Sequence, residues 1–221
     1  MPPTDLILLR HGETAWNRDR RIQGQLDTPL NDEGVRQARA AGRRLAAERA
    51  RWGLASAADA PAPAMVSSDL LRCRQTAEPI ATALGLDCVT DARLRERDFG
   101  VFQGRTYPDL KREDPERFER WLHRDPDYDI DGGESLRTFA RRIESVLTEL
   151  GTAHRGRTVV VVTHGGVLDV ANRLCRGLAL EAQRDFDIPN AGLNWLRFDG
   201  SRFELRVWGD VGHWQGSLDE L

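Results

Sequence analysis

The sequence predicts a three-layer α/β/α sandwich with a mostly parallel central sheet. Strand-like segments alternate with segments of helical period along the 221 residues, which is typical of a parallel sheet covered by helices. The first apolar run, 5–9, and the β-branched run 158–163 both end at a His-Gly pair. Ligands bind beyond the carboxyl ends of the strands in such sheets. We therefore expect His11 and His164 to meet at one edge of the sheet.

The first strand is followed by a loop and a long helix. Residues 5–9 are apolar and stop abruptly at Arg10, which indicates a buried strand followed by a functional turn. Apolar residues then recur at spacings of three and four over about 32–52, which predicts a helix. Residues 53–63 are rich in Ala and Pro and are expected to form a surface loop.

A second strand and helix follow, and then a segment without clear periodicity. Residues 64–67 are a strand candidate, and the next helix runs to about Leu84, with Ser68 or Asp69 as its N-cap. Residues 86–89 are another strand candidate. The polar, proline-containing stretch 93–134 predicts an excursion over the sheet, with a single short helix near 116–122.

The C-terminal part returns to regular patterns. Helical periodicity over 135–150 precedes the strand at 158–163, and a further helix is expected over about 167–176. The segments 193–198 and 203–208 flank Asp-Gly-Ser and predict a hairpin. We expect residues 1–221 to form one domain in which the excursion covers the functional edge.

Composition excludes several classes of function. The chain is 40% hydrophobic and 30% charged with a net charge of −3, so it lacks the basic surplus of a nucleic-acid-binding protein. No apolar run approaches the roughly 20 residues of a membrane span, and the N-terminus does not resemble a signal peptide. Three widely spaced cysteines indicate reduced thiols. A cytoplasmic protein without nucleic-acid or membrane partners is expected.

The residues at the predicted strand edge suit phosphoryl transfer. Such chemistry needs cationic donors, an in-line nucleophile and an acid for the leaving group. His11 can attack phosphorus as a neutral imidazole, with Arg10 beside it. Arg72 and His164 are candidates for the remaining charge, and Glu96 is a candidate for the acid. Each residue taken alone is also compatible with a structural or surface role, so the spacing predicts only a candidate anion site.

A series of ordered motifs carries the interpretation further. Residues 9–17, Leu-Arg-His-Gly-Glu-Thr-Ala-Trp-Asn, resemble the signature of the histidine phosphatase superfamily (branch 1), the phosphoglycerate mutase-like proteins. Similar blocks follow in the family's order at 23–31, 67–77, 94–100, 132–135 and 162–165, and Asn190 resembles a later family position. The resemblance implies a phosphoglycerate mutase-like fold and a phosphohistidine intermediate.

The resemblance also implies residue roles. His11 resembles the phosphorylated histidine and Glu96 the proton donor that later activates water, while Arg10, Arg72 and His164 resemble the pocket for the phosphoryl oxygens. His164 would act as a cation or as a hydrogen-bond donor. The neighbouring arginines should lower the pKa of His11 and keep it nucleophilic. The substrate-binding positions implied are Asn17, Gln23, Gly24 and Gly165.

No metal or other cofactor is implied, because arginines supply the charge that Mg²⁺ supplies in kinases. The expected partner is a small phosphorylated metabolite, and the sequence leaves open whether the protein is a monomer or a homodimer. It also does not identify the physiological substrate or the role of the tail around His213.

Several activities are compatible with these motifs. We favour a metal-independent phosphomonoesterase over a phosphoglycerate mutase. The reason is that the acidic segment 125–131 would repel a second anionic group if its Asp125, Asp127, Asp129 and Asp131 faced the pocket. A phosphatase specific for a sugar phosphate or α-ribazole phosphate remains an alternative, because the 94–100 block resembles that subgroup but also occurs in broad-specificity members. A catalytically inactive scaffold would lack one of the core residues, and all are present.

Overall fold

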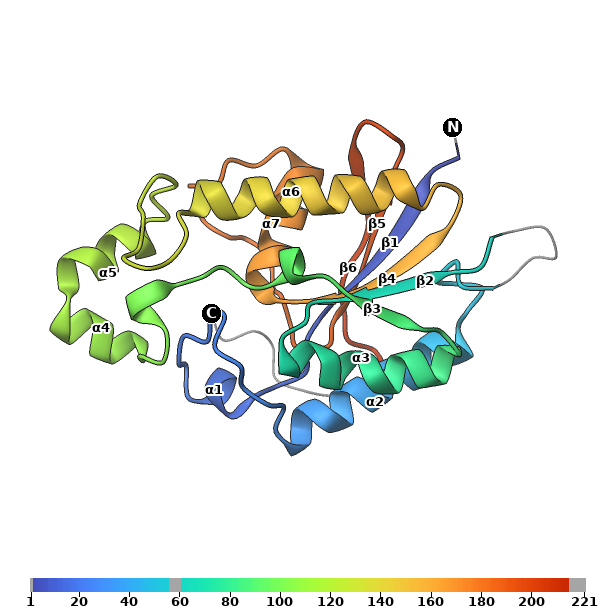
Figure 1. The fold of residues 1–221 in the computed structure, drawn as a ribbon, viewed down its shortest axis with the longest axis horizontal. Helices are drawn as coiled ribbons and strands as arrows, with labels where there is room; N and C mark the ends of the chain where they lie inside the picture. Colours follow the sequence, from blue (N-terminus) through green and yellow to red (C-terminus); the bar gives the residue numbers. More distant parts are fainter. Residues whose placement is uncertain (1, 56–60, 215–221) are drawn as a thin grey trace.

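A computed structural model of the chain describes residues 2–55 and 61–214. Its centre is a six-stranded mixed sheet with the order β3-β2-β4-β1-β5-β6 (Figure 1). The strands are β1 (Thr4–Arg10), β2 (Ala64–Ser67), β3 (Cys88–Thr90), β4 (Thr158–Thr163), β5 (Leu193–Phe198) and β6 (Phe203–Asp210). The first four are parallel, and β5 and β6 form the antiparallel hairpin. The predicted fold class is confirmed.

Helices cover both faces of the sheet. Successive side chains of a strand point to opposite faces, so the apolar strands need helices on both sides. These helices are α2 (Asp32–Ala47), α3 (Leu71–Leu84), α6 (Leu136–Ala153) and α7 (Gly165–Arg176). Leu6 and Leu8 of β1 pack in the cluster that includes α6 and α7, and Ile7 and Leu9 pack in the cluster that includes α2 and α3. Figure 1 shows α6 and α7 on one side of the sheet and α2 and α3 on the other.

Two boundary predictions are wrong. Helix α2 ends at Ala47 rather than near residue 52, because the chain leaves helical geometry at Glu48 and turns so that Trp52 is fully buried. Helix α3 has Leu70 as its N-cap and no side-chain cap. Asp27 instead accepts the Leu71 N–H at 2.5 Å. The middle of the loop predicted at 53–63, residues 56–60, lies outside the described residues.

The excursion is more ordered than its polar composition indicates. It contains α4 (Tyr107–Glu113) as well as α5 (Pro115–Leu122), preceded by 3-10 turns at Ala92–Leu94 and Gly100–Phe102. Pro108 and Pro115 lie in the first turns of α4 and α5, where proline is favoured, so these prolines begin helices rather than interrupting them. Only one of the two helices was expected. With the short α1 (Ala15–Arg18), they lie beyond the carboxyl end of the sheet (Figure 1).

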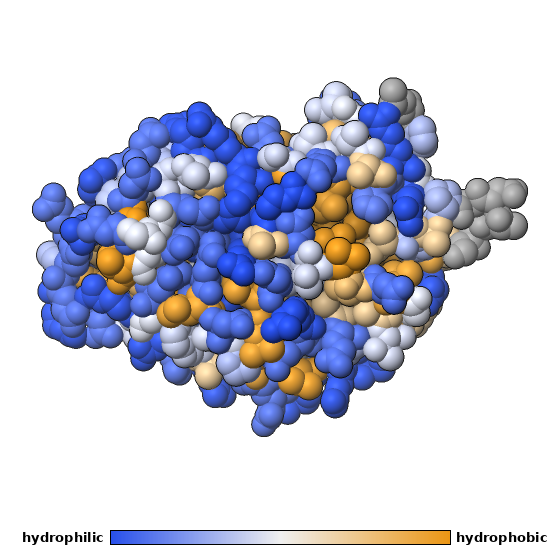
Figure 2. Space-filling model, viewed as in Figure 1, coloured by the Kyte–Doolittle hydropathy of each residue, from blue (hydrophilic) through white to orange (hydrophobic). Residues whose placement is uncertain are grey.

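The excursion has a small core of its own. It is built from Ile22, Phe102, Leu110, Phe118, Tyr128 and Ile130. Its surface is mainly hydrophilic, whereas apolar side chains are exposed over the β3 edge of the sheet, where Val89 is 66% exposed (Figure 2). No helix among the described residues is long and apolar enough to cross a membrane.

Candidate active site

The parallel pairing of β1 and β4 brings the two histidines together. Arg10 is opposite Thr163 in the register, and the His11 N–H donates to the Thr163 carbonyl at 2.9 Å. The rings of His11 and His164 consequently lie edge to face with centroids 5.3 Å apart. The expectation that both histidines meet at one edge of the sheet is therefore confirmed.

His11 is oriented as a nucleophile would be. Its Nδ1 lies 2.8 Å from the Gly12 carbonyl, which can only accept, so Nδ1 carries the proton and Nε2 keeps its lone pair. Asn190 holds the same backbone by donating to the His11 carbonyl at 2.9 Å. Burial lowers the pKa of His11 well below its ordinary value, and the charges of Arg72 and Arg10 lower it further. The ring is therefore neutral at physiological pH.

Both arginines predicted for the pocket are buried and anchored by backbone carbonyls. Arg10 Nη1 donates to Ile188 at 2.7 Å. Arg72 donates from Nη1 to Leu26 at 2.9 Å and from Nη2 to Gly24 at 2.7 Å. Within the described residues the buried Nε of Arg72 has no hydrogen-bond partner. A buried donor without a partner is costly, and an anionic ligand would relieve that cost.

His164 is fully buried directly after β4. Its Nε2 lies 2.8 Å from Ser68 Oγ, and the Cys73 thiol packs against the same ring. Burial and the Arg72 charge lower the pKa of His164 well below its ordinary value. Of the two roles considered for His164, the neutral hydrogen-bond donor fits this environment and the cation does not.

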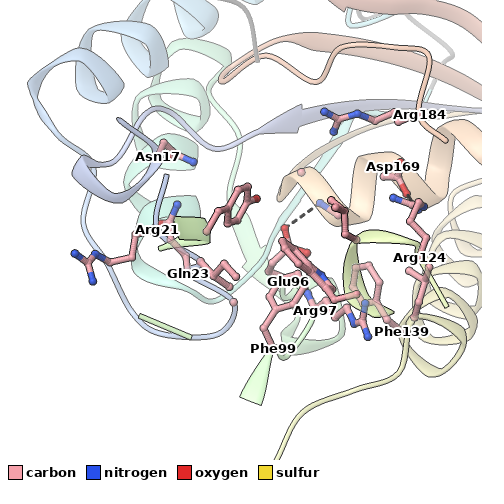
Figure 3. Close-up of a pocket in the computed structure, with 18 of the residues that line it drawn as sticks. Asn17, Arg21, Gln23, Glu96, Arg97, Phe99, Arg124, Phe139, Asp169 and Arg184 are labelled. Carbon is pink, nitrogen blue, oxygen red and sulfur yellow. Dashed lines mark hydrogen bonds and ion pairs between the residues drawn. The ribbon is translucent and has the colours of Figure 1, made fainter. Parts of the chain in front are cut away.

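Glu96 is held at the cavity by two backbone N–H groups. Arg97 donates to Oε1 at 2.7 Å, and Gly166 donates to Oε2 at 2.9 Å (Figure 3). The Gly166 N–H comes from the first turn of α7, directly after His164. This contact links the excursion to the strand end that carries the second histidine.

The four predicted substrate-binding residues also line the cavity. Asn17 forms a capping box with Thr14, and Gln23 Oε1 accepts from the Thr14 and Thr28 hydroxyls. Gly24 has φ +52, and its carbonyl receives Arg72. Gly165 lies against the Arg10 side chain.

These residues surround a cavity of ≈ 620 Å³ between the sheet edge and the excursion. His164 is fully buried and is not among the lining residues. Sequence reasoning missed several lining residues. Arginines and aromatic rings predominate among them, namely Arg21, Arg97, Arg124, Arg184, Phe99, Tyr107, Trp121 and Phe139. Arg97 could have been suspected because it adjoins Glu96, whereas Arg124 and Arg184 belong to no motif.

Comparison with known proteins places this arrangement in a family. Residues 6–211 match the model of the histidine phosphatase superfamily (branch 1). The chain belongs to this superfamily. A similar relative is phosphoglycerate mutase-like protein 4 of Arabidopsis thaliana, 38% identical over 95% of this chain and 86% of that protein.

Two solved structures are similar to this chain along nearly their whole length. YhfR of Bacillus stearothermophilus is 30% identical with a TM-score of 0.82, covering 95% of this chain and 98% of that one. A mycobacterial glucosyl-3-phosphoglycerate phosphatase is 31% identical with a TM-score of 0.76, covering 94% and 99%. Similar proteins are thus named as mutases or phosphatases, which makes this chain a member of a family of phosphoryl-transfer enzymes.

The acidic segment does not face the histidine phosphatase cavity. Asp125 forms an ion pair with Arg120, Asp127 with Arg137 and Asp131 with Arg117. None of the four aspartates lines the cavity, whereas Arg124, directly before the segment, does. The condition under which this segment would repel a second anionic group is therefore not met, and Asp125, Asp127 and Asp131 pair with arginines outside the cavity.

The described residues contain no cluster of three or more His, Cys, Asp and Glu side chains that could hold a metal ion. His213 is half-buried in the described end of the tail, and burial lowers its pKa to about 4. It is not among the cavity-lining residues.

Proposed function

We propose that the protein is a metal-independent phosphatase that hydrolyses small phosphomonoesters through a phosphohistidine on His11. The observation that carries the proposal is the state of His11, a neutral imidazole whose proton is held on Nδ1 by Gly12. Its Nε2 lone pair is available beside Arg10 and Arg72 on the cavity wall. An activated nucleophile beside preorganised cations is what phosphoryl transfer requires.

In the first step, His11 Nε2 attacks phosphorus and the P–N bond forms as the P–O bond to the leaving group breaks. Glu96 in its acid form gives a proton to the departing oxygen. Arg10 and Arg72 neutralise the charge on the phosphoryl oxygens, and the hydrogen bonds to backbone carbonyls keep both guanidiniums in place. His164 is buried and supports the His11 ring through their edge-to-face contact.

In the second step, the Glu96 carboxylate takes a proton from water, whose oxygen attacks phosphorus. The P–N bond breaks, its electron pair returns to Nε2, and inorganic phosphate leaves. Glu96 is returned to its acid form, so the cycle closes without a cofactor. Asn17, Gln23 and the backbone at Gly24 and Gly165 would line the path of the substrate, since all four border the cavity.

Water is favoured as the acceptor because the cavity is large. A volume of ≈ 620 Å³ exceeds that of a small ester, so water, at about 30 Å³ per molecule, has room beside the intermediate. Similarity to a phosphatase over nearly the whole of both chains supports the same choice. A mutase is the second candidate, supported by the similarity to the mutase-like relative and by the arginines at the far side of the cavity.

The test is to expose the protein briefly to a ³²P-labelled ester, quench it and locate the label. Acid-labile, base-stable label on His11, absent from His11→Ala and present in His154→Ala, is expected. His154 is a matched control because it lies outside the cavity. Label on serine or cysteine would contradict the mechanism. Incubation with 3-phosphoglycerate and its bisphosphate primer separates the two candidates, because a phosphatase releases inorganic phosphate and a mutase forms the isomer.

A further inference from the structure

The turn that carries His11 lies outside regular secondary structure. Gly12 is the residue after the proposed nucleophile, and its carbonyl receives the His11 Nδ1 proton at 2.8 Å. A Cβ on Gly12 would lie 2.4 Å from the carbonyl oxygen of Gly34 in α2, so only glycine fits this close approach. Because a glycine backbone is permissive, contacts from outside the turn must fix the direction of the Gly12 carbonyl.

The peptide group between His11 and Gly12 is anchored at both of its polar ends. Its N–H, that of Gly12, donates to Thr76 Oγ1 at 3.0 Å, and its carbonyl, that of His11, accepts from Asn190 Nδ2 at 2.9 Å. Thr76 lies in the second turn of α3, is fully buried and is not among the cavity-lining residues. It can therefore affect a bound substrate only through the residues that it holds.

The Thr76 hydroxyl also binds the backbone of Arg72. Its Oγ1 donates to the Arg72 carbonyl, one helical turn back, at 2.7 Å. An amide N–H can only donate and a carbonyl can only accept, so the hydroxyl proton points to Arg72 and a lone pair points to Gly12. One hydroxyl of fixed orientation thus joins the turn of the proposed nucleophile to the helix of the phosphate-binding arginine.

A second threonine of α3 shows what the Thr76 hydroxyl adds. Thr82 makes the same bond to the carbonyl one turn back, that of Glu78, at 3.0 Å, but it is exposed in the last turn of the helix. Such a bond is neutral or slightly unfavourable for a helix, so helix formation does not account for a buried threonine at position 76. The contact with Gly12 is what distinguishes Thr76 from Thr82.

We propose that Thr76 is a positioning residue for His11. By holding the Gly12 N–H it fixes the Gly12 backbone, which keeps the Gly12 carbonyl on the Nδ1 proton and leaves the Nε2 lone pair available to the substrate. Without the hydroxyl, a buried N–H would lack a partner, and rotation of the Gly12 backbone would relieve that cost. The same rotation would release the Nδ1 proton and allow the unreactive tautomer. The inference rests on the proposed function and deepens it, because it names the buried hydroxyl that sets the tautomer of the nucleophile.

The tautomer of His11 can be measured in the full-length protein by two-bond ¹H–¹⁵N correlation of the imidazole ring, with His11→Ala to assign the signals. The wild type is expected to show a protonated Nδ1 and an unprotonated Nε2. Thr76→Val keeps the shape of the side chain and removes the hydroxyl, so the Nε2 signal should move toward the protonated position as the two tautomers mix. Thr76→Ser keeps the hydroxyl and should restore the wild-type signals.

Kinetics separate positioning from phosphate binding. Thr76→Val should lower kcat for p-nitrophenyl phosphate about 10- to 100-fold, the size expected when a reacting group moves by about 1 Å. The inhibition constant of inorganic phosphate should stay within about threefold, because Arg10 and Arg72 keep their own anchors. Thr76→Ser should recover kcat to within about threefold of the wild type, since the hydroxyl is present again.

Two other threonines provide matched controls. Thr82→Val removes the same bond within α3, and Thr4→Val removes a fully buried hydroxyl that donates to the Gly151 carbonyl at 2.6 Å. Thr4 begins β1 and so lies at the opposite end of that strand from His11. Both variants should keep the His11 signals and should keep kcat within about twofold.

An unchanged Nε2 signal in Thr76→Val, or an equal loss of kcat in either control, would overturn the proposal. A failure of Thr76→Ser to restore both readouts would do so as well. If Thr76→Val does not fold, the wild type decides. Its Thr76 hydroxyl proton should exchange slowly and show a nuclear Overhauser contact to the Gly12 amide, whereas a Gly12 amide that exchanges as fast as in an unfolded chain would contradict the bond.

The tautomer measurement does not depend on phosphohistidine chemistry. If the wild type forms no phosphohistidine and Thr76→Val still mixes the His11 tautomers, the proposed function fails and the positioning role stands. If the wild type is labelled on His11 and Thr76→Val is labelled at the same rate with the same tautomer, the positioning role fails and the proposed function stands.

Discussion

The Gly166 backbone and the Glu96 carboxylate are in direct contact. The Gly166 N–H donates to Oε2 at 2.9 Å, and a Cβ added to Gly166 would lie 2.2 Å from Oε1 and 3.2 Å from Cε1 of Phe139. Because the buried Phe139 ring lies on the other side, a side chain at position 166 cannot avoid the Glu96 carboxylate. The absence of a side chain at position 166 thus determines where the proposed proton donor sits.

Gly166→Ala should lower kcat by about 10- to 100-fold, because displacing a catalytic group by about 1 Å has effects of this size. Arg176→Ala is the control in the same helix. Arg176 is exposed at the far end of α7, pairs with Asp185 and does not line the cavity. Steady-state kinetics of both variants with one alkyl phosphate test the prediction. Similar kcat values for the two alanine variants would show that the contact with Glu96 does not position the acid.

Glu96→Gln should slow esters with poor leaving groups far more than esters with good ones. An alkyl alcohol needs a proton as it departs, whereas p-nitrophenolate does not, and general acid catalysis contributes about 10²- to 10⁴-fold. The glutamine also keeps an acceptor for the Gly166 N–H, so the backbone contact survives. The comparison is kcat/KM for glycerol 3-phosphate against p-nitrophenyl phosphate. Equal losses with both esters would remove Glu96 from the acid role.

The meeting of the two histidines at the carboxyl edge of the sheet could be predicted from the sequence, because each histidine directly follows a strand. His11 follows β1, His164 follows β4, and parallel pairing of two buried strands brings whatever follows them together. Arg72 was one candidate among the residues, and the family resemblance assigned it to the pocket. Its anchoring to Gly24 and Leu26 depends on a loop that no periodicity describes.

The far side of the cavity could not be predicted, because it depends on how the excursion packs. Arg124 reaches the cavity only because α5 ends where it does and Asp169 of α7 lies opposite. The sequence showed instead an acidic segment, and three of its aspartates pair outside the cavity with Arg117, Arg120 and Arg137. Composition reveals the charges of a segment but not the side to which they point.

Cys73 and Cys175 should be inert in the folded protein. Burial raises the pKa of Cys73 and of Cys175 to about 12, so little thiolate is present near neutrality. Iodoacetamide at pH 8 should leave the proposed phosphatase activity unchanged, although Cys73 lies against His164. Mass spectrometry should find Cys73 unmodified in the native protein and alkylated in urea. Rapid native alkylation of Cys73 with loss of activity would contradict the buried, protonated thiol described here.

The stability of the protein should fall as the pH drops below about 6.5. Burial lowers the pKa of His11 and His164 well below 6.5 in the folded state, while both titrate near 6.5 in the unfolded chain. Between about pH 5 and 6.5 the unfolded state therefore binds protons that the folded state does not. The free energy of unfolding consequently decreases as the pH is lowered through this range. Each histidine contributes up to about 1.4 kcal/mol per pH unit to the slope of the free energy of unfolding against pH, and above pH 7 neither contributes to that slope.

Urea unfolding at several pH values should show this slope. His11→Asn should reduce the slope, whereas replacing the exposed His123 should not. An unchanged slope in His11→Asn would mean that the folded protein binds a proton at His11 as readily as the unfolded chain, which would undermine its assignment as a neutral nucleophile.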